Sequence, residues 1–272
     1  SQSPTVLDQL LDDVRTRVRN RDDVEPWYTS SERKSAESIG TEAVMNALVL
    51  CIQDAESNQR RLSETTRNAL DWMWTQQNSS GDHSGAWPWL DFKLEPWESE
   101  SATFWGASLA AIAVGIAPDN YADEADVADN IAALKSYLQQ NLGDQSLHHR
   151  AVALMASTRL PGLIDPPQQQ SIVKDILGSQ RRDGSWSLDQ LGSWRRSNDS
   201  NDAYATGLMV YTLSQFRSPE YRDAISRGRD WLIENQHSET GGWMAKSVNK
   251  QRAQDSFVGM FMQDAATAYA VL

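Results

Sequence analysis

The sequence predicts an all-α protein whose helices form two concentric layers, and three observations lead to this prediction. A pattern of Gln, Gly and Trp recurs along the chain. Between its copies, amphipathic segments alternate with segments that are apolar at helical spacing and rich in small residues. Alternating Val, Ile and Thr runs, which would indicate strands, are almost absent. Small-residue helices can pack closely in an inner layer, and amphipathic helices can cover them with their charged faces toward water.

The two kinds of helix alternate from one end of the chain to the other, about five of each. We expect the amphipathic, outer helices in segments 7–20, 69–87, 131–141, 168–180 and 227–243. We expect the small-residue, inner helices at 40–53, 101–115, 147–157, 201–215 and 263–272.

The repeated pattern follows the outer helices and has three good copies. They are Gln77, Gly85 and Trp87; Gln180, Gly184 and Trp186; and Gln236, Gly241 and Trp243. The last two Gln residues stand 56 positions apart, and segment 131–141 keeps the helix and the Gln without the Gly and Trp. A Gln that caps a helix end and a Trp stacked at the next turn would tie each outer helix to its neighbour. We therefore interpret the pattern as structural.

These copies resemble the QW repeats of the squalene-hopene cyclase and prenyltransferase superfamily, from about residue 40 to the end. The resemblance implies an α/α toroid of about five to six helix pairs. It also implies a single domain over 1–272, with an N-terminal helix and lead-in at 1–39 and repeats at 40–272. The N-terminal ends of the inner helices would face one end of a central cavity. Within this superfamily the chain resembles single-domain squalene-cyclase-like proteins of bacteria more than triterpene cyclases or protein prenyltransferases.

Class II cyclases of this superfamily carry Asp-x-Asp-Asp at the start of an inner helix, and the middle Asp donates a proton. The matching stretch here is 199–202, with Asp199 and Asp202, but Asn201 stands where the acid would be. An amide cannot donate a proton as a carboxylic acid does. Protein prenyltransferases of this superfamily bind zinc through an Asp-x-Cys pair. Here Val49 stands two before the single cysteine, Cys51, so that pair is missing. We expect no metal and no cofactor.

Acidic residues and histidines stand at or just before the expected starts of the inner helices. They are Glu42, Glu98, Glu100, His148, His149, Asp202 and Asp264. Each alone could simply cap a helix. If they converge, crowded carboxylates raise one another's pKa, so that Asp202 or Asp264 could stay protonated and act as a general acid. His148 could remove a proton at the end. The expected catalytic residues are Asp202, Asp264, Asp199, His148 and Glu42. Adjacent helical residues point about 100° apart, so one of His148 and His149 should face outward.

Substrate contacts are expected mainly in the loop over 87–105, which is rich in Trp, Pro and acidic residues. Such a loop could roof a cavity or could simply pack its Trp on Pro. Tyr204 follows the acidic stretch, and Lys246 lies in a basic tract at 243–252 that could receive a diphosphate or carboxylate, or stay solvated. The expected substrate-binding residues are Trp87, Trp89, Trp97, Trp105, Glu100, Tyr204 and Lys246.

Composition limits the partners. The formal charge of −12 over 272 residues disfavours nucleic acid. The sequence contains no run of 18 or more apolar residues, so no membrane span is predicted. Peripheral contact with a membrane stays open. The cysteine lies in an apolar run, where a buried thiol is expected. The polar start favours an exported, periplasmic protein over a cytoplasmic one.

The resemblance, together with the carboxylates at the helix starts, implies a protein that acts on an isoprenoid in an apolar cavity by acid-initiated cyclisation, isomerisation or hydration. One alternative is a toroid that binds a lipid or a protein without catalysis. A second is a carbohydrate-active enzyme in which Asp202 and Asp264 are acid and base. The character of the cavity separates them: a dry aromatic cavity favours isoprenoids, an open groove with exposed Trp favours sugars, and a filled centre favours scaffolding.

Overall fold

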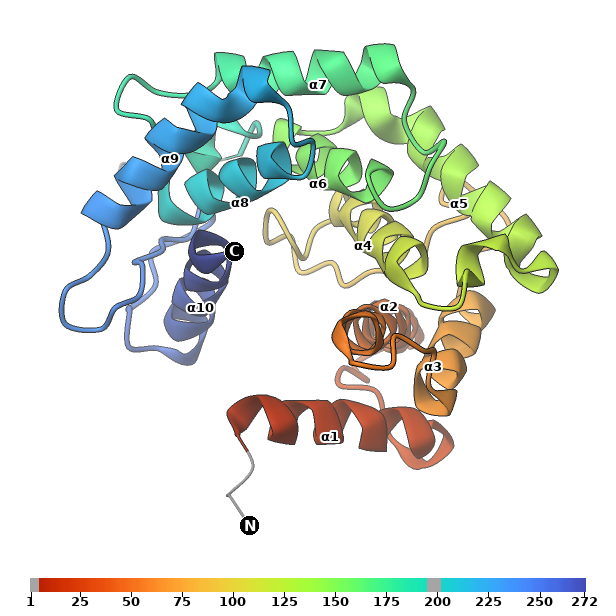
Figure 1. Cartoon of the computed structure of the whole chain (residues 1–272). Coiled ribbons are helices and arrows are strands. Elements are labelled where there is room, and N and C mark those ends of the chain that lie inside the picture. Colours follow the sequence, from red (N-terminus) through yellow and green to blue (C-terminus); the bar gives the residue numbers. More distant parts are fainter. Residues whose placement is uncertain (1–4, 195–201) are drawn as a thin grey trace. The chain divides into compact units, whose positions relative to one another are not determined.

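A computed structural model describes residues 5–194 and 202–272, and all regular structure within these ranges is helical. Leu94 and Glu98 form one isolated bridge. The all-α prediction is therefore confirmed for the described chain. The α-helices are α1 (Val6–Arg19), α2 (Glu32–Glu56), α3 (Glu64–Thr75), α4 (Ala102–Ile116), α5 (Ala128–Asn141), α6 (Leu147–Ser157), α7 (Pro166–Gly178), α8 (Asp202–Ser214), α9 (Arg222–Glu234) and α10 (Phe257–Val271) (Figure 1).

The chain divides into two compact units. Unit 1 holds the described residues up to Gly143 together with Arg159–Leu163, and unit 2 holds Asp144–Thr158 and Ile164–Leu272. Helices α1 to α5 belong to unit 1, and helices α6 to α10 belong to unit 2.

In unit 1 the small-residue helices α2 and α4 pack against each other, and amphipathic helices cover them (Figure 1). Helix α3 lies on α2, helix α5 lies on α4, and α1 contacts both α2 and α3. Ala47 of α2 and Ala107 and Ala110 of α4 are fully buried. Side chains of this size let two helix backbones approach closely, which is why α2 and α4 form the inner pair of this unit.

Unit 2 repeats the arrangement. Helix α8 contacts α6 and α10, which are also rich in small residues, while α9 lies on α8 and α7 lies on α6. A Cβ atom on Gly207 of α8 would stand 2.8 Å from the backbone carbon of Tyr269 in α10. Only a residue without a side chain permits this approach of the two inner helices.

The first copy of the Gln-Gly-Trp pattern is a hydrogen-bonded link between outer helices. The Nε2 group of Gln77, just after α3, donates to the carbonyl oxygens of Gly85 at 2.9 Å and of Asn130 in α5 at 3.1 Å. The indole N–H of Trp87 donates to the carbonyl of Met73 in the last turn of α3 at 2.6 Å. Gln77 therefore holds the next outer helix, α5, and Trp87 holds the end of α3.

The second copy has the same bonds. Gln180, after α7, donates from Nε2 to the carbonyls of Gly184 at 2.9 Å and of Ala224 in α9 at 2.8 Å. The indole N–H of Trp186 donates to the carbonyl of Ile176 at 2.7 Å. The structural interpretation of the pattern is therefore confirmed twice, once in each unit.

The third copy shows the bonds within its own loop and to its own helix, α9, and adds a contact to the inner layer. Gln236 donates to the carbonyl of Gly241 at 2.6 Å, and the indole of Trp243 donates to the carbonyl of Leu232 at 2.8 Å. The backbone N–H of Trp243 donates to the hydroxyl of Thr267 in α10 at 3.1 Å. The Trp thus connects an outer helix with an inner one.

The glycine of the pattern is required for two separate reasons. Gly85 and Gly184 have φ values of +92° and +94°, in the left-handed region. A Cβ atom would also stand 2.2 Å from the carbonyl oxygen of Ala133 at the first site and 2.5 Å from that of Arg227 at the second. Both backbone conformation and close contact with the next outer helix exclude other residues.

Two inner helices begin earlier than the sequence analysis expected. Helix α2 begins at Glu32, so the expected boundary at residue 40 falls inside it, and α10 begins at Phe257 instead of near residue 263. In both cases a serine accepts a hydrogen bond from the first turn: Ser31 from the N–H of Lys34, and Ser256 from the N–H of Gly259. These caps set the helix starts.

Helix α2 is the one described helix long and apolar enough to cross a membrane by length and composition. In the structure it packs against α1, α3 and α4. Cys51, on this helix, is fully buried, as expected, and burial raises the pKa of its thiol. These contacts are those of a core helix.

Substitution of Gly184 by Ala should destabilise the protein by about 1–3 kcal/mol, since the new Cβ imposes left-handed strain and meets the Arg227 carbonyl. The matched control is Gly178→Ala in α7, where a Cβ would meet nothing within 4 Å. That substitution should be neutral or stabilising by up to about 1 kcal/mol. Urea unfolding followed by circular dichroism measures both, and equal midpoints for the two variants would contradict the role given to Gly184.

Candidate functional site

The expected acidic motif lies largely outside the described residues. Asp199 and Asn201 fall within 195–201. Asp202 is the first residue of α8, and only its backbone is described. The site must therefore be built from the residues around the start of α8 and its neighbour α6.

His148 is the central residue of this region. It lies in the first turn of α6 and is fully buried, and its Nε2 atom is 2.8 Å from the phenol oxygen of Tyr204 in α8. The other ring nitrogen, Nδ1, is buried and has no hydrogen-bond partner among the described residues. Either the phenol donates to Nε2, or Nε2–H donates to the phenol. In the first case Nδ1 carries the proton and can donate a hydrogen bond; in the second Nδ1 is unprotonated and can accept a proton.

The imidazole of His148 is uncharged at neutral pH. Burial, and secondly the neighbouring His149, lower its pKa well below the usual value of 6.5. A cation inside an apolar environment loses its hydration, so the neutral ring is favoured.

Aromatic rings surround the imidazole in unit 2. The ring of Tyr204 is centred 5.8 Å from that of His148, and the ring of Trp194 is 5.7 Å away. Tyr269 of α10 packs edge-on against Tyr204 at 5.4 Å. The backbone N–H of His148 donates to the carbonyl of Leu191 at 2.9 Å, which fixes the 188–194 segment over the start of α6. We call His148, Tyr204, Trp194 and Tyr269 the His148 cluster.

The expectation that one of the two histidines faces outward is wrong. His149 is fully buried as well, with its ring 5.2 Å from that of His148 and its Nδ1 3.4 Å from the side-chain oxygen of Gln145. The two rings do point in different directions, as the helical spacing requires, but residues from other parts of unit 2 cover both.

Glu42 and Asp264 do not lie at helix starts. Glu42 is in the middle of α2, and Asp264 is exposed in the middle of α10, because both helices begin earlier than expected. Glu42 accepts two hydrogen bonds from Arg17 of α1, from Nε at 2.5 Å and from Nη2 at 2.8 Å. Both carboxylate oxygens of Glu42 are thus occupied by Arg17, and the residue lies away from the helix starts where the general acid was expected.

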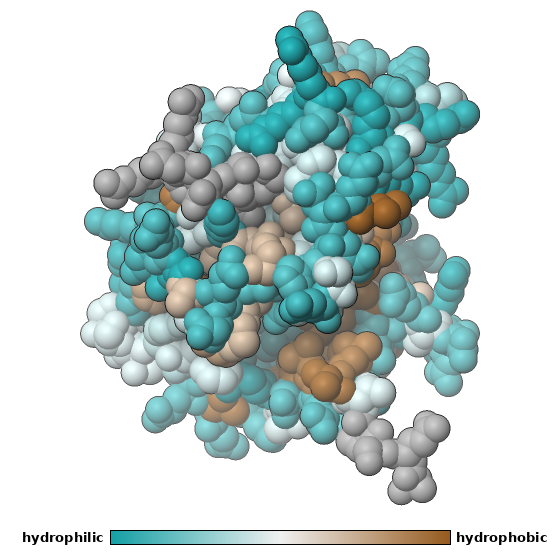
Figure 2. Space-filling view, turned by 90° about the vertical axis from the view of Figure 1, so that its left-hand side faces the viewer, coloured by the Kyte–Doolittle hydropathy of each residue, from teal (hydrophilic) through white to brown (hydrophobic). Residues whose placement is uncertain are grey.

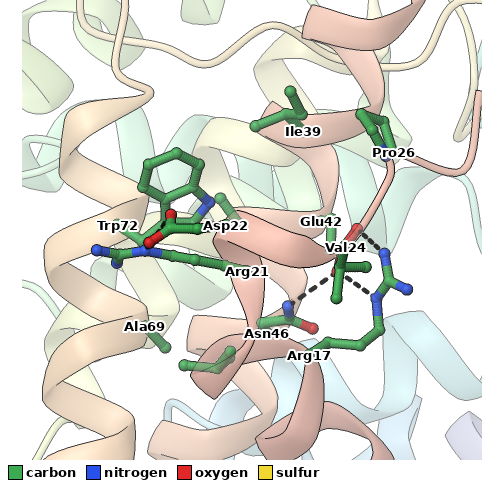
Figure 3. Close-up of a pocket in the computed structure, with 12 residues that line it drawn as sticks. Arg17, Arg21, Asp22, Val24, Pro26, Ile39, Glu42, Asn46, Ala69 and Trp72 are labelled. Carbon is green, nitrogen blue, oxygen red and sulfur yellow. Dashed lines mark hydrogen bonds and ion pairs between the residues drawn. The ribbon is translucent and has the colours of Figure 1, made fainter. Parts of the chain in front are cut away.

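Glu42 instead lines a pocket of 240 Å³ in unit 1, bounded by α1, η1 (Arg21–Asp23), α2 and α3. Arg17, Glu42 and Asn46 form one side of it, and Arg21, Asp22 and Trp72 form the other (Figure 3). Apolar residues complete the lining: Val18, Val24, Pro26, Ile39, Ala43 and Ala69.

Both arginines of this pocket are held against tryptophans. The guanidinium of Arg21 lies 4.8 Å from the ring centre of Trp72, and that of Arg17 lies 4.5 Å from that of Trp27, which is 68% exposed. Arg21 also pairs with Asp22 at 3.5 Å. Stacking of this kind fixes the direction of the remaining N–H groups.

The acidic residues before α4 do not form a crowded group of carboxylates. Glu100 is exposed in the turn before Ala102. Glu98 is half-buried, and its pKa is raised by burial, while Lys34 opposes the shift. The cause is loss of hydration and not another carboxylate, in contrast to the expected mechanism.

Two of the tryptophans expected to contact a substrate belong to the core of unit 1. Trp87 is 1% exposed and Trp89 is 4% exposed. The indole of Trp89 donates to the carbonyl of Trp97 at 2.8 Å, and its ring lies edge-on to Trp105 at 5.6 Å. This corrects the expectation for Trp87 and Trp89, whose indoles are packed and not open to a ligand.

The remaining expected contacts are partly accessible. Trp97 and Trp105 are half-buried, and Lys246 is exposed. The indole N–H of Trp105 is buried without a hydrogen-bond partner among the described residues. Trp97 and Trp105 lie in unit 1, and Lys246 and the His148 cluster lie in unit 2. Their roles as substrate contacts stay predictions.

Among residues 5–194 and 202–272, no group of three or more His, Cys, Asp or Glu side chains is placed to hold a metal ion.

Sequence reasoning missed the buried carboxylate of Glu37 and the two rings of Trp194 and Tyr269. Glu37 in α2 is 6% exposed, pairs with Lys34 and with Arg33, and accepts the N–H of Asp91 at 3.2 Å. It anchors the Trp-rich loop to α2. An acidic residue on the helical face that carries Gly40 and Ala43 was the available signal, but the helix was expected to begin too late to include it.

Comparison with known proteins adds no assignment: no protein-family model and no curated protein matches this chain.

The buried His148 should make the stability of the protein depend on pH. Below about pH 6.5 the unfolded chain protonates this residue and the folded chain does not, so unfolding is favoured as the pH falls. We expect the free energy of unfolding of the wild type, relative to His148→Gln, to fall by about 1.4 kcal/mol per pH unit between about pH 6.5 and 5.

Urea titrations at several pH values measure this difference. The control is His83→Gln, which removes an exposed histidine instead of a buried one. A wild-type curve parallel to that of His148→Gln would show that His148 is protonated in the folded protein.

Proposed function

We propose that the protein acts on an apolar isoprenoid by acid-initiated cyclisation, isomerisation or hydration, in a cavity enclosed by an α/α toroid. The observation that carries the proposal is the His148 cluster: a fully buried, uncharged imidazole, bonded to a buried phenol and surrounded by aromatic rings. The alternation of inner and outer helices within each unit, and the links between successive outer helices, support the toroid.

The cluster suits the last step of such a reaction. A carbocation is stabilised by aromatic faces, which attract positive charge without providing a nucleophile that would trap it. Tyr204, Trp194 and Tyr269 are rings of this kind, and burial raises the pKa of Tyr269 to about 12, so its phenol stays neutral. In the tautomer whose Nε2–H donates to Tyr204, the Nδ1 of His148 is unprotonated and can accept the proton that the cation loses. Even a weakly basic imidazole suffices, because a proton next to a carbocation is very acidic.

The first step needs a proton donor, and we assign it to Asp202. This residue begins α8, two positions before Tyr204, which bonds to His148. The assignment of Asp202 follows from its place at the start of an inner helix, and a carboxylic acid in an apolar cavity is disfavoured in its charged form. Asp264 is exposed in the middle of α10 and is not proposed for this role, and the role expected of Asp199 stays a prediction.

A protein that binds an apolar ligand without turnover would use the same rings. The sequence feature that favours it is Asn201, the amide in the position of the expected acid. Large apolar side chains also reach the surface on α1 and α10, among them Leu7, Leu10, Phe257 and Met260, and Figure 2 shows apolar patches within a hydrophilic face. Peripheral contact with a membrane, from which such a ligand would be taken, stays a prediction.

The test is incubation of the purified protein with squalene, farnesyl diphosphate and geranylgeranyl diphosphate, followed by extraction and mass spectrometry. We expect a new cyclic, isomerised or hydrated product from at least one substrate. Asp202→Asn should lower its rate by about 100-fold or more, the usual contribution of a general acid. His148→Gln should change the product distribution or lower the rate, because the final proton has lost its acceptor.

The matched control is Asp129→Asn, an exposed residue in the first turn of the outer helix α5, which should keep the wild-type rate. Retention of a substrate without turnover would replace the proposal with the binding function. Absence of both retention and turnover would reject an isoprenoid ligand.

A further inference from the structure

A second binding site lies in unit 1. We propose that the 240 Å³ pocket between α1, η1, α2 and α3 binds a neutral, polyhydroxylated ring of monosaccharide size. The proposal rests on the size of the pocket, its charge balance and the hydrogen-bonding groups that remain available in it. It does not depend on the isoprenoid function.

The size limits the ligand. Pockets for drug-sized ligands measure about 300–1,000 Å³, and this one lies just below that range. A single six-membered ring with its substituents is therefore the appropriate scale, and a chain of rings would have to extend out of the pocket.

The charges of the lining exclude a strongly charged ligand. Arg17 is neutralised by the two hydrogen bonds to Glu42, and Arg21 is paired with Asp22. An anion would meet two carboxylates, and a cation would meet two guanidinium groups. A neutral ligand meets neither penalty.

The pocket lining offers both hydrogen-bond donors and hydrogen-bond acceptors that its own internal bonds do not use. Arg17 bonds to Glu42 through Nε and Nη2, and no hydrogen bond in the described chain uses its Nη1. Asn46 makes one long bond, from Nδ2 to Glu42 at 3.4 Å, which leaves its side-chain oxygen as an acceptor. Glu42 has further acceptor capacity, since a carboxylate offers about four lone-pair sites. A hydroxyl group both donates and accepts, so a ring with several hydroxyls matches this mixture.

The groups are also held in place before a ligand arrives. Arg21 is stacked on Trp72, and Arg17 is fixed between Glu42 and the ring of Trp27, as Figure 3 shows in part. Val18, Ile39 and Ala43 supply an apolar wall for the C–H groups of a ring. Little conformational entropy is lost when a ligand binds to side chains already fixed in this way.

The experiment is a titration followed by saturation-transfer NMR, with glucose, N-acetylglucosamine and myo-inositol as neutral probes and glucuronate as the charged one. We expect at least one neutral probe to bind with a dissociation constant of about 1 mM, so that its binding saturates by ~10 mM, ten times that value. Glucuronate should bind more weakly than glucose, because its carboxylate faces Glu42 and Asp22.

Two variants locate the site. Asn46→Leu removes an acceptor and a donor, and Trp72→Ala releases Arg21; each should weaken binding about tenfold, the effect of losing one good hydrogen bond. The control is Trp231→Ala, which removes the tryptophan that occupies the position of Trp72 in another copy of the repeat, in α9 of unit 2. Circular dichroism shows that each variant is folded.

Three outcomes would overturn the proposal. The first is no saturable binding of any neutral probe over this range, and the second is tighter binding of glucuronate than of glucose. The third is equal loss of binding in Trp231→Ala and Trp72→Ala, which would place the ligand elsewhere.

Discussion

The glutamine amide that follows an outer helix is the interaction on which the architecture depends. In the first two copies of the repeat one Nε2 group donates to two backbone carbonyls, one in its own loop and one in the next outer helix. Two backbone acceptors are satisfied by a single side chain, so the ends of two helices stay close without exposing unpaired polar groups. The geometry requires the loop to touch the next helix, and that is why the loop carries glycine.

The same link determines where the His148 cluster can form. The second copy ends at Trp186, whose N–H donates to Thr206 of α8 at 2.9 Å and whose indole is tied to α7. The chain that leaves this fixed point is the 188–194 segment, which supplies the Leu191 carbonyl and the ring of Trp194 to His148. The structural repeat thus positions the segment that covers the buried imidazole of His148.

The sequence allowed the helical class, the alternation of layers and the role of the repeat to be predicted, because each depends on local spacing. The starts of α2 and α10 were missed, since the small-residue pattern begins later than the helix, and the caps Ser31 and Ser256 went unused as signals. That error misplaced Glu42 and Asp264. Neither the burial of both His148 and His149 nor the pocket beside Trp72 could be predicted, because each is formed by side chains from segments distant in sequence. Tyr204 was named as a contact, but its bond to His148 depends on the packing of α6 against α8.

Links between successive outer helices have a consequence for how such a protein changes in evolution. Each one joins residues about fifty positions apart and reaches only the adjacent helix, as Gln77 with Asn130 and Gln180 with Ala224 show. The fold is therefore assembled from neighbours, in the manner of a linear array. A helix pair with its own Gln, Gly and Trp can be duplicated or deleted as one block, and the pairs on either side can form the same bonds with each other. Copies can also lose their Gly and Trp, as segment 131–141 has, while Gln139 still donates to the carbonyl of Gly162 at 3.0 Å.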